Sequence, residues 1–200
     1  MRIKFNKEIE FFFKKIFFSK SFLLKKRLER SIKNNEENEL KLIKNFMLPN
    51  TDSIDIGVYR GVYSFLMSKF SQTVHAFEPN PIIYKDLEKN LLKIIKNIKI
   101  YNYALSDKNE NVELKVPIRN PNFNENNYEE YFEMGKATIH ETNTVKNYKS
   151  YNIKTKKLDD FKFSKKISFI KIDVEGHETE VIKGSLNTIK MHKPTLLVEI

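Results

Sequence analysis

Short apolar runs and longer segments with helical apolar spacing alternate along the chain from residue 53 onward. Each apolar run has the length of a buried strand, and each helical segment repeats its apolar residues every three to four positions. Five strands are expected, at residues 53–57, 73–77, 98–102, 167–173 and 195–200. Three helices are expected between them, at residues 61–70, 81–97 and 178–191. Strands that alternate with helices predict an α/β fold with a mostly parallel sheet and helices on both faces.

Residue types at two places indicate where helices begin and end. Asn80 is a preferred N-cap residue, and Pro81 suits the first helical position because no amide hydrogen is needed there. Residues 34–50 contain a polar link followed by a helix that Pro49 ends.

A long polar insertion interrupts the alternation between the third and fourth strands. Residues 112–116 are expected to form a further strand, whereas residues 117–150 are polar and rich in Asn and Tyr. An irregular segment of this length in a compact domain is typical of a lid, a binding loop or a mobile region.

The first fifty residues are basic and rich in Phe, and we expect a helical arm at 1–50 before a single domain at 51–200. No apolar run over 1–33 approaches the ~20 residues needed to span a bilayer. Lys14 and Lys15 also interrupt any secretory signal. The Phe-rich face of residues 1–33 is expected either to pack on the core or a partner protein, or to rest on an anionic membrane surface.

Composition and charge exclude several classes of protein. Residues 1–50 hold 13 Lys and Arg against 6 Asp and Glu, so most of the net charge of +10 lies on the arm. The rest of the chain is close to neutral, and no nucleic-acid partner is expected. The absence of Cys excludes a disulfide scaffold, a thiolate nucleophile and a Cys-based zinc site, and it fits a cytoplasmic protein.

A glycine-containing turn between a strand and a helix, DIGVYRG at 55–61, is the first candidate ligand site. Gly57 and Gly61 lack a Cβ atom, so a cofactor can approach the backbone closely. Asp55, near the end of the strand, can hold an ammonium group of the cofactor directly or through water. About twenty residues later, Glu78 ends the next strand, where a carboxylate can accept hydrogen bonds from ribose hydroxyls.

The spacing of these glycines favours one class of cofactor over another. The dinucleotide fingerprint is G-x-G-x-x-G, whereas this turn has only G-x-x-x-G, and Asp55 would repel a pyrophosphate. A nucleoside cofactor that carries an amino acid is therefore favoured, with an NAD-dependent enzyme as a weaker alternative. The turn alone is also compatible with glycines that serve packing only.

A second cluster of polar residues, KIDVEGHE at 171–178, follows the most apolar strand. Ligands of open α/β sheets bind beyond the carboxyl ends of the strands, so this cluster is expected at the same edge as Glu78. Asp173 or Glu175 can accept a proton from a substrate hydroxyl, and His177 can relay it. The same side chains are also candidate ligands of a divalent metal.

The segment NYALSD at 102–107 follows the third strand. Either Asn102 or a backbone amide near Ala104 is expected to contact the edge of an adenine. A simple polar turn is an equally good interpretation.

Four segments together resemble the FkbM-type methyltransferase family: DIGVYRGVYS (55–64), VHAFEPNP (74–81), NYALSD (102–107) and IKIDVEGHETEVIKG (170–184). The resemblance spans about residues 53–200 and implies a Rossmann-like class I methyltransferase fold with S-adenosyl-L-methionine as methyl donor. By position it implies cofactor contacts for Asp55, Gly57, Gly61 and Glu78, and a place near the transferred methyl group for Asp173.

The chain departs from the family pattern at several positions. Val58-Tyr59 stands where the family usually has Ala-Asn, and we expect Tyr59 to stack on the cofactor or shield it. Ser64, in the same segment, completes the expected cofactor contacts. The chain stops at Ile200 within the fifth strand, where the family fold continues with a helix and a hairpin. A truncated product, or an oligomer or partner that covers the strand at 195–200, is therefore expected.

The function that the resemblance implies is O-methylation, often of sugar hydroxyls. We expect a methyltransferase that acts on a hydroxyl of a sugar, in a glycan or a glycosylated metabolite. The alternative is a non-catalytic or truncated methyltransferase-like domain that acts by docking on a partner. A cytoplasmic location is expected, with contact of the arm to the inner face of the membrane as one option.

Overall fold

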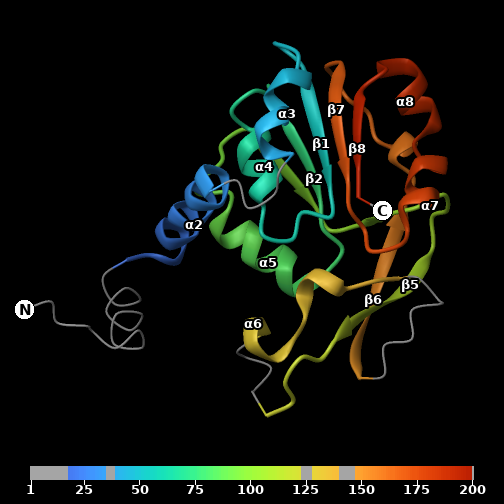
Figure 1. Cartoon of the computed structure of the whole chain (residues 1–200). Coiled ribbons are helices and arrows are strands. Elements are labelled where there is room, and N and C mark those ends of the chain that lie inside the picture. Colours follow the sequence, from blue (N-terminus) through green and yellow to red (C-terminus); the bar gives the residue numbers. More distant parts are fainter. Residues whose placement is uncertain (1–17, 35–38, 123–127, 140–146, 200) are drawn as a thin grey trace, which may run out of the picture.

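The computed structural model describes residues 18–34, 39–122, 128–139 and 147–199. Its centre is a five-stranded parallel sheet with the strand order β3-β2-β1-β7-β8 (Figure 1). The strands are β1 (Asp52–Ile56), β2 (Val74–Phe77), β3 (Ile98–Tyr101), β7 (Ile167–Ile172) and β8 (Thr195–Val198). All five predicted strands are confirmed, with ends that differ by at most two residues, and the parallel α/β fold is confirmed with them.

Alternation along the central strands supplies apolar side chains to both faces of the sheet. Ile54 and Ile56 of β1 pack in one core cluster with Val181, whereas Phe169 of β7 packs in the other cluster with Leu28. Helices α2 (Lys20–Asn34), α3 (Leu40–Phe46), α4 (Val62–Met67) and α5 (Pro81–Asn90) cover one face. Helices α7 (Glu178–Lys183) and α8 (Leu186–His192) cover the other, with a short 3-10 turn at Leu158–Asp160 (Figure 1).

The three predicted helices are shorter in the structure or broken, and α4 ends at Met67 instead of near residue 70. α5 begins as expected, because the Asn80 side chain accepts a hydrogen bond from the amide of Ile82 and Pro81 occupies the first turn. It ends at Asn90 rather than near residue 97. The single helix expected at 178–191 is wrong, since the chain breaks at Gly184 between α7 and α8. A Cβ atom on Gly184 would lie 2.0 Å from the carbonyl oxygen of Ser106, so the chain passes too close for any other residue.

The insertion is more regular than the sequence indicated. β5 (Asn111–Pro117) confirms the predicted strand, and it pairs antiparallel with β6 (Tyr148–Lys156). β6 also pairs parallel with β4 (Ala104–Leu105), so the three strands form a second sheet in the order β4-β6-β5. The prediction missed β6, whose last residues lie beyond the expected insertion at 117–150.

The described part of the insertion is anchored to the domain. It contains α6 (Tyr128–Tyr131) and a 3-10 turn at Met134–Lys136. Phe132 and Met134 are buried in the core cluster below α5, and Phe132 bridges to Ile118 at the end of β5. Within the described residues, the insertion therefore contains short regular elements that the sequence did not predict. Residues 123–127 and 140–146 lie outside the description, and a role as a lid or binding loop stays a prediction.

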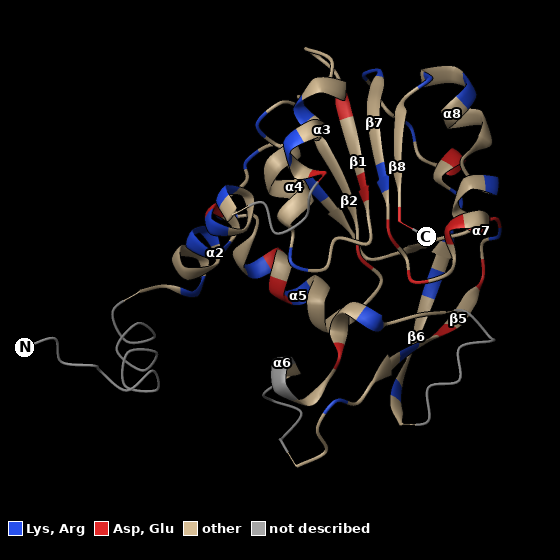
Figure 2. Ribbon diagram, in the orientation of Figure 1, with Lys and Arg blue, Asp and Glu red and all other residues tan. Residues whose placement is uncertain are grey.

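The described part of the first fifty residues packs on the same domain. α2 contacts α4 and α5, and α3 contacts α4. Leu28, Leu40 and Ile43 are buried in the core, while basic residues are spread along α2 (Figure 2). Residues 1–17 lie outside the description, and the predicted boundary near residue 50 stays a prediction. No helix in the described ranges is long and apolar enough to cross a bilayer.

Candidate active site

Parallel strands place the polar residues that follow β1, β2 and β7 at one edge of the sheet. A pocket opens there, with a free volume of about 690 Å³ that includes the part open to solvent. Seven predicted site residues line it: Gly57, Tyr59, Glu78, Ala104, Asp173, Glu175 and His177. The remaining ones (Asp55, Gly61, Ser64 and Asn102) do not line it and lie behind its wall or beside it. Seven of the eleven predicted site residues therefore lie together at one pocket, and their roles stay predictions.

The turn after β1 is held in a conformation that favours glycine. Gly57 and Gly61 have φ values of 81° and 79°, and Tyr59 lies between them at 48°. A Cβ atom on Gly57 would lie 1.8 Å from the carbonyl oxygen of Asp173, so this glycine lets the loops after β1 and β7 touch. Gly61 instead packs against Leu91, where a Cβ atom would lie 2.9 Å from a methyl group of the leucine. Of these two glycines, only Gly57 borders the pocket, whereas Gly61 serves the packing of α4 against Leu91.

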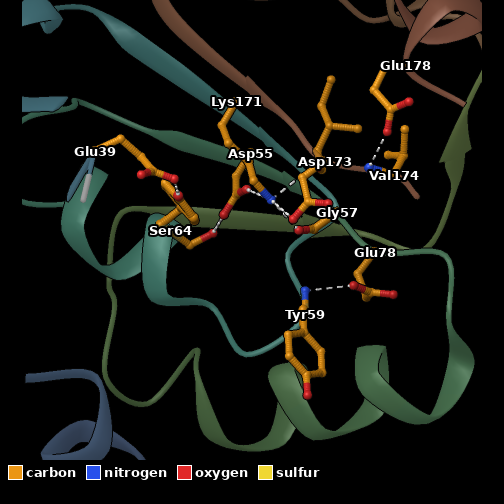
Figure 3. A network of polar contacts seen from close by, with 12 residues as sticks. Glu39, Asp55, Gly57, Tyr59, Ser64, Glu78, Lys171, Asp173, Val174 and Glu178 are labelled. Atoms are coloured by element: carbon orange, nitrogen blue, oxygen red, sulfur yellow. Dashed lines mark hydrogen bonds and ion pairs between the residues drawn. The ribbon is translucent and has the colours of Figure 1, made fainter. Parts of the chain in front are cut away.

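Glu78 ends β2 with its carboxylate in the wall of the pocket. One oxygen accepts a hydrogen bond of 2.9 Å from the amide of Tyr59 (Figure 3). The other accepts one of 2.9 Å from the amide of Asn80. Burial raises the pKa of this carboxyl to about 7, although the two backbone hydrogen bonds act in the opposite direction. Each oxygen keeps a further lone pair for a ligand in the pocket.

Asn102 supports Glu78 from outside the pocket. Its side-chain amide donates hydrogen bonds to the carbonyl oxygens of Glu78, at 2.8 Å, and Pro79, at 3.1 Å. Ala104, two residues later, begins β4 and does line the pocket, with Tyr103 beside it. The sequence left two candidate contacts for an adenine, the Asn102 side chain and a backbone amide near Ala104. In the structure the backbone near Ala104 lies at the pocket, whereas the Asn102 side chain binds the loop after β2.

A buried lysine that sequence analysis missed lies beneath the Gly57 turn. The Lys171 ammonium donates to the carbonyl oxygen of Gly57 at 2.8 Å and to the carboxylate of Asp173 at 3.1 Å. It also lies 3.8 Å from an oxygen of Asp55, whose other oxygen accepts a hydrogen bond of 2.6 Å from Ser64 (Figure 3). A single basic residue in the otherwise apolar strand, two positions before Asp173, was the signal available in the sequence.

Asp55 is part of this network rather than of the pocket surface. Its side chain is fully buried, and burial raises the pKa of the carboxyl, against the opposing effect of Lys171 and Ser64. Its oxygen nearest Lys171 has no hydrogen-bond partner among the described residues. The geometry therefore does not favour a direct contact between Asp55 and a ligand in the pocket. Asp55 contacts Lys171, which in turn binds Gly57 and Asp173.

The two other predicted catalytic residues lie on the loop after β7. Burial and the neighbouring Asp173 raise the pKa of Glu175, whose backbone carbonyl accepts a hydrogen bond of 2.9 Å from Thr138. One ring nitrogen of His177 lies 3.0 Å from the Ser106 hydroxyl, and the other lies 3.7 Å from a carboxylate oxygen of Glu180. The contacts of His177 orient its ring, whereas the bond from Thr138 holds only the backbone of Glu175. A proton relay through His177 stays a prediction.

A metal site is the remaining alternative for this loop. Glu178, in the first turn of α7, accepts hydrogen bonds from the amides of Val174 and Gly176. These bonds order the loop between β7 and α7. Within the described residues there is no group of three or more His, Asp or Glu side chains arranged to hold a metal ion.

Comparison with known proteins identifies the family of this fold and pocket. The Methyltransferase FkbM domain matches residues 55–200. The crystal structure of methyltransferase FkbM from Methylobacillus flagellatus KT superposes with a TM-score of 0.50 at 18% sequence identity. That superposition covers 74% of this chain and 32% of the other, so the chain spans about a third of the length of that protein and shares its fold. No curated protein matches the chain.

The domain match begins at Asp55 and takes in the Gly57 turn, Glu78 and the loop after β7. It therefore covers the whole of the pocket wall built by the central sheet, and most of the chain. The protein belongs to the FkbM methyltransferase family.

Proposed function

We propose that this chain transfers a methyl group from S-adenosyl-L-methionine to a hydroxyl group of a sugar, in a glycan or a glycosylated metabolite. The observation that carries the proposal is the meeting of Gly57, Glu78 and Asp173 in one pocket at the carboxyl ends of the parallel strands. The family supports methyl transfer, and the sugar acceptor is the finer part of the proposal.

The pocket wall fits a nucleoside donor that carries an amino acid. The Glu78 carboxylate has lone pairs left for two ribose hydroxyls, and the bare Gly57 backbone leaves room beside it. Ala104 and Tyr103 also line the pocket, and a base can lie beside them. When bound, S-adenosyl-L-methionine supplies a methyl group that is open to attack by an oxygen nucleophile.

Asp173 is the group best placed to take the proton from the acceptor hydroxyl. Its side chain is 30% exposed and lines the pocket, while Lys171 holds the carboxylate from behind at 3.1 Å. The ion pair fixes one orientation of the carboxylate, and orientation of the reacting groups is a large part of catalysis in a displacement reaction. Glu175, on the same loop, is the alternative base and lies nearer to solvent.

Two measurements on the whole chain test the proposal. Calorimetric titration with S-adenosylhomocysteine is expected to show binding, and Glu78→Ala is expected to weaken it by about tenfold or more, because a charge-assisted hydrogen bond is lost. Glu113→Gln, at an exposed position of β5, is the control for a removed carboxylate. A folded sample that does not bind, or a Glu78→Ala variant that binds normally, would contradict the proposed donor site.

The second measurement separates donor binding from chemistry. Asp173→Asn is expected to retain binding of S-adenosylhomocysteine within a few-fold and to lower methyl transfer by about a hundredfold or more, as for the loss of a general base. Equal turnover in Asp173→Asn and the unmodified chain would remove Asp173 from that role.

A further inference from the structure

A second pocket adjoins the first one, and arginine residues dominate its charge. Arg27 of α2, Arg60 of the turn between β1 and α4, and Arg119 just after β5 all line it. The sequence contains 36 Lys and Arg residues, of which only five are Arg, at positions 2, 27, 30, 60 and 119. Three of these five converge on one pocket from three separate elements, which we call the arginine pocket.

Arginine and lysine are not equivalent at such a site. The guanidinium group is planar and presents several donors that match the oxygens of a phosphate or carboxylate, whereas lysine offers a strongly hydrated point charge. Most basic residues of this chain are lysine, and most of its few arginine residues lie where several donors could hold one anionic group. All three arginine residues are exposed, so a ligand in solution can reach them.

The charge of the arginine pocket remains positive after its own acid is counted. Asp86 is the one acid among the described residues that line it, and this carboxylate is paired with Lys20. The Lys20 ammonium also lies 3.4 Å from the hydroxyl of Tyr128, another residue of the wall. The backbone amide of Arg119 donates to the carbonyl oxygen of Tyr131, which fixes the start of its side chain against α6.

The arginine pocket and the proposed donor pocket share a wall. Tyr59, Ile83 and Met134 line both of them. The Tyr59 ring is turned away from Gly57 and Asp173 toward α5, and the Arg60 guanidinium lies 5.1 Å from the centre of the ring (Figure 3). A ligand that follows this wall can therefore reach from the guanidinium groups to the side of the pocket where Asp173 lies.

We propose that the arginine pocket binds a phosphate group carried by the methyl acceptor, which makes the acceptor a phosphorylated sugar. The inference rests on the proposed function, because the acceptor hydroxyl has to reach Asp173. A phosphate ester carries about −1.5 to −2 charges near pH 7 and three acceptor oxygens, which suits three guanidinium groups better than the single charge of a carboxylate does. The apolar wall at Tyr59, Ile83 and Met134 would lie along the sugar ring.

The test uses three sugars that share the same ring: glucose 1-phosphate, which carries a phosphate at C1, glucuronate, which carries a carboxylate at C6, and uncharged glucose. Each is titrated into the full chain, saturated with S-adenosylhomocysteine, and followed by NMR of the backbone amides. Glucose 1-phosphate is expected to bind most tightly. Arg27→Gln and Arg119→Gln are each expected to weaken it by about tenfold, as for the loss of one charge-assisted contact. Arg30→Gln, exposed on the same helix as Arg27 but outside the pocket, is the matched control and is expected to bind normally.

A separate titration of S-adenosylhomocysteine into each variant distinguishes this inference from the proposed function. If Arg27→Gln and Arg119→Gln weaken the nucleoside instead of the sugar phosphate, the arginine pocket serves the donor and the inference is wrong. Equal affinity for glucuronate and glucose 1-phosphate, or equal losses in Arg30→Gln, would also overturn it. If the nucleoside fails to bind any variant while glucose 1-phosphate binding depends on Arg27 and Arg119, the phosphate site stands and the proposed methyl donor is wrong.

Discussion

The clearest quantitative prediction concerns the proton on Glu78. Burial raises the pKa of this carboxyl to about 7 from an ordinary value of 4.5. That difference corresponds to about 3 kcal/mol of extra cost for ionising the group in the folded protein. Between these two pH values the folded protein keeps the proton and the unfolded chain does not. The contribution of Glu78 to the free energy of unfolding therefore falls as pH rises from about 4.5 to about 7, and it is level above that.

Glu78→Gln isolates this contribution, because the amide does not titrate. The glutamine side chain also turns a donor toward the amide of Tyr59 or Asn80, which costs a hydrogen bond by an amount that does not vary with pH. The informative quantity is thus the slope of the stability difference with pH and not its size. Urea denaturation at several pH values from 4.5 to 8 is expected to show the unmodified chain losing about 3 kcal/mol relative to Glu78→Gln.

The same proton links stability to the proposed donor. Ribose hydroxyls donate to the ionised carboxylate, so binding of S-adenosylhomocysteine is expected to strengthen about tenfold between pH 6 and pH 8. Glu113→Gln, which removes a carboxylate from an exposed position, controls for the change in net charge. Stability curves for the unmodified chain and Glu78→Gln that run parallel with pH would refute the assigned proton, and a pH-independent affinity would refute its link to the ligand.

Three further substitutions test other parts of the structure by urea denaturation. Lys171→Met is expected to cost about 3–5 kcal/mol because it leaves Asp55 buried without its cation; an unchanged midpoint would mean that the pair contributes little. Gly57→Ala is expected to lose stability together with S-adenosylhomocysteine binding, since its Cβ atom would lie 1.8 Å from the Asp173 carbonyl, and a stable variant with normal affinity is incompatible with that contact. Phe132→Ala is expected to cost about 3–5 kcal/mol as a core truncation, whereas a loss under about 1 kcal/mol would show that the insertion is not anchored there.

The centre of the sheet could be predicted because β1, β2 and β7 are buried on both faces. A mostly apolar run such as ISFI in β7 has few other interpretations. β6 was missed since one of its faces is exposed. Its buried positions, Ile153 and Thr155, alternate with exposed polar ones in a segment rich in Lys and Asn. The break at Gly184 was missed, and the close approach of Gly184 to Ser106 joins residues nearly eighty positions apart in the chain.

In the candidate site, too, residues placed by their own strand could be predicted, whereas residues placed by distant contacts could not. Glu78 and Asp173 follow directly on strands, so the sheet alone brings them to one edge. The role of Asp55 could not be read from its position near a strand end, because its side chain faces Lys171 of a neighbouring strand and not the pocket. Arg27 and Arg119 are far apart in sequence, and only the folded chain shows that they line the same pocket.

The contact between Gly57 and the Asp173 carbonyl joins two walls of the pocket into one unit, and the Lys171 ammonium binds both of them. The half of the site that rests on the central sheet is therefore built as a single block, in which Gly57 and Asp173 keep a constant separation. The insertion contributes Met134 and Gly135 to the other half, where a Cβ atom on Gly135 would lie 3.5 Å from the Tyr59 ring. If the pocket widens to admit a ligand, we expect the movement at Met134 and Gly135 and not in the loops after β1 and β7.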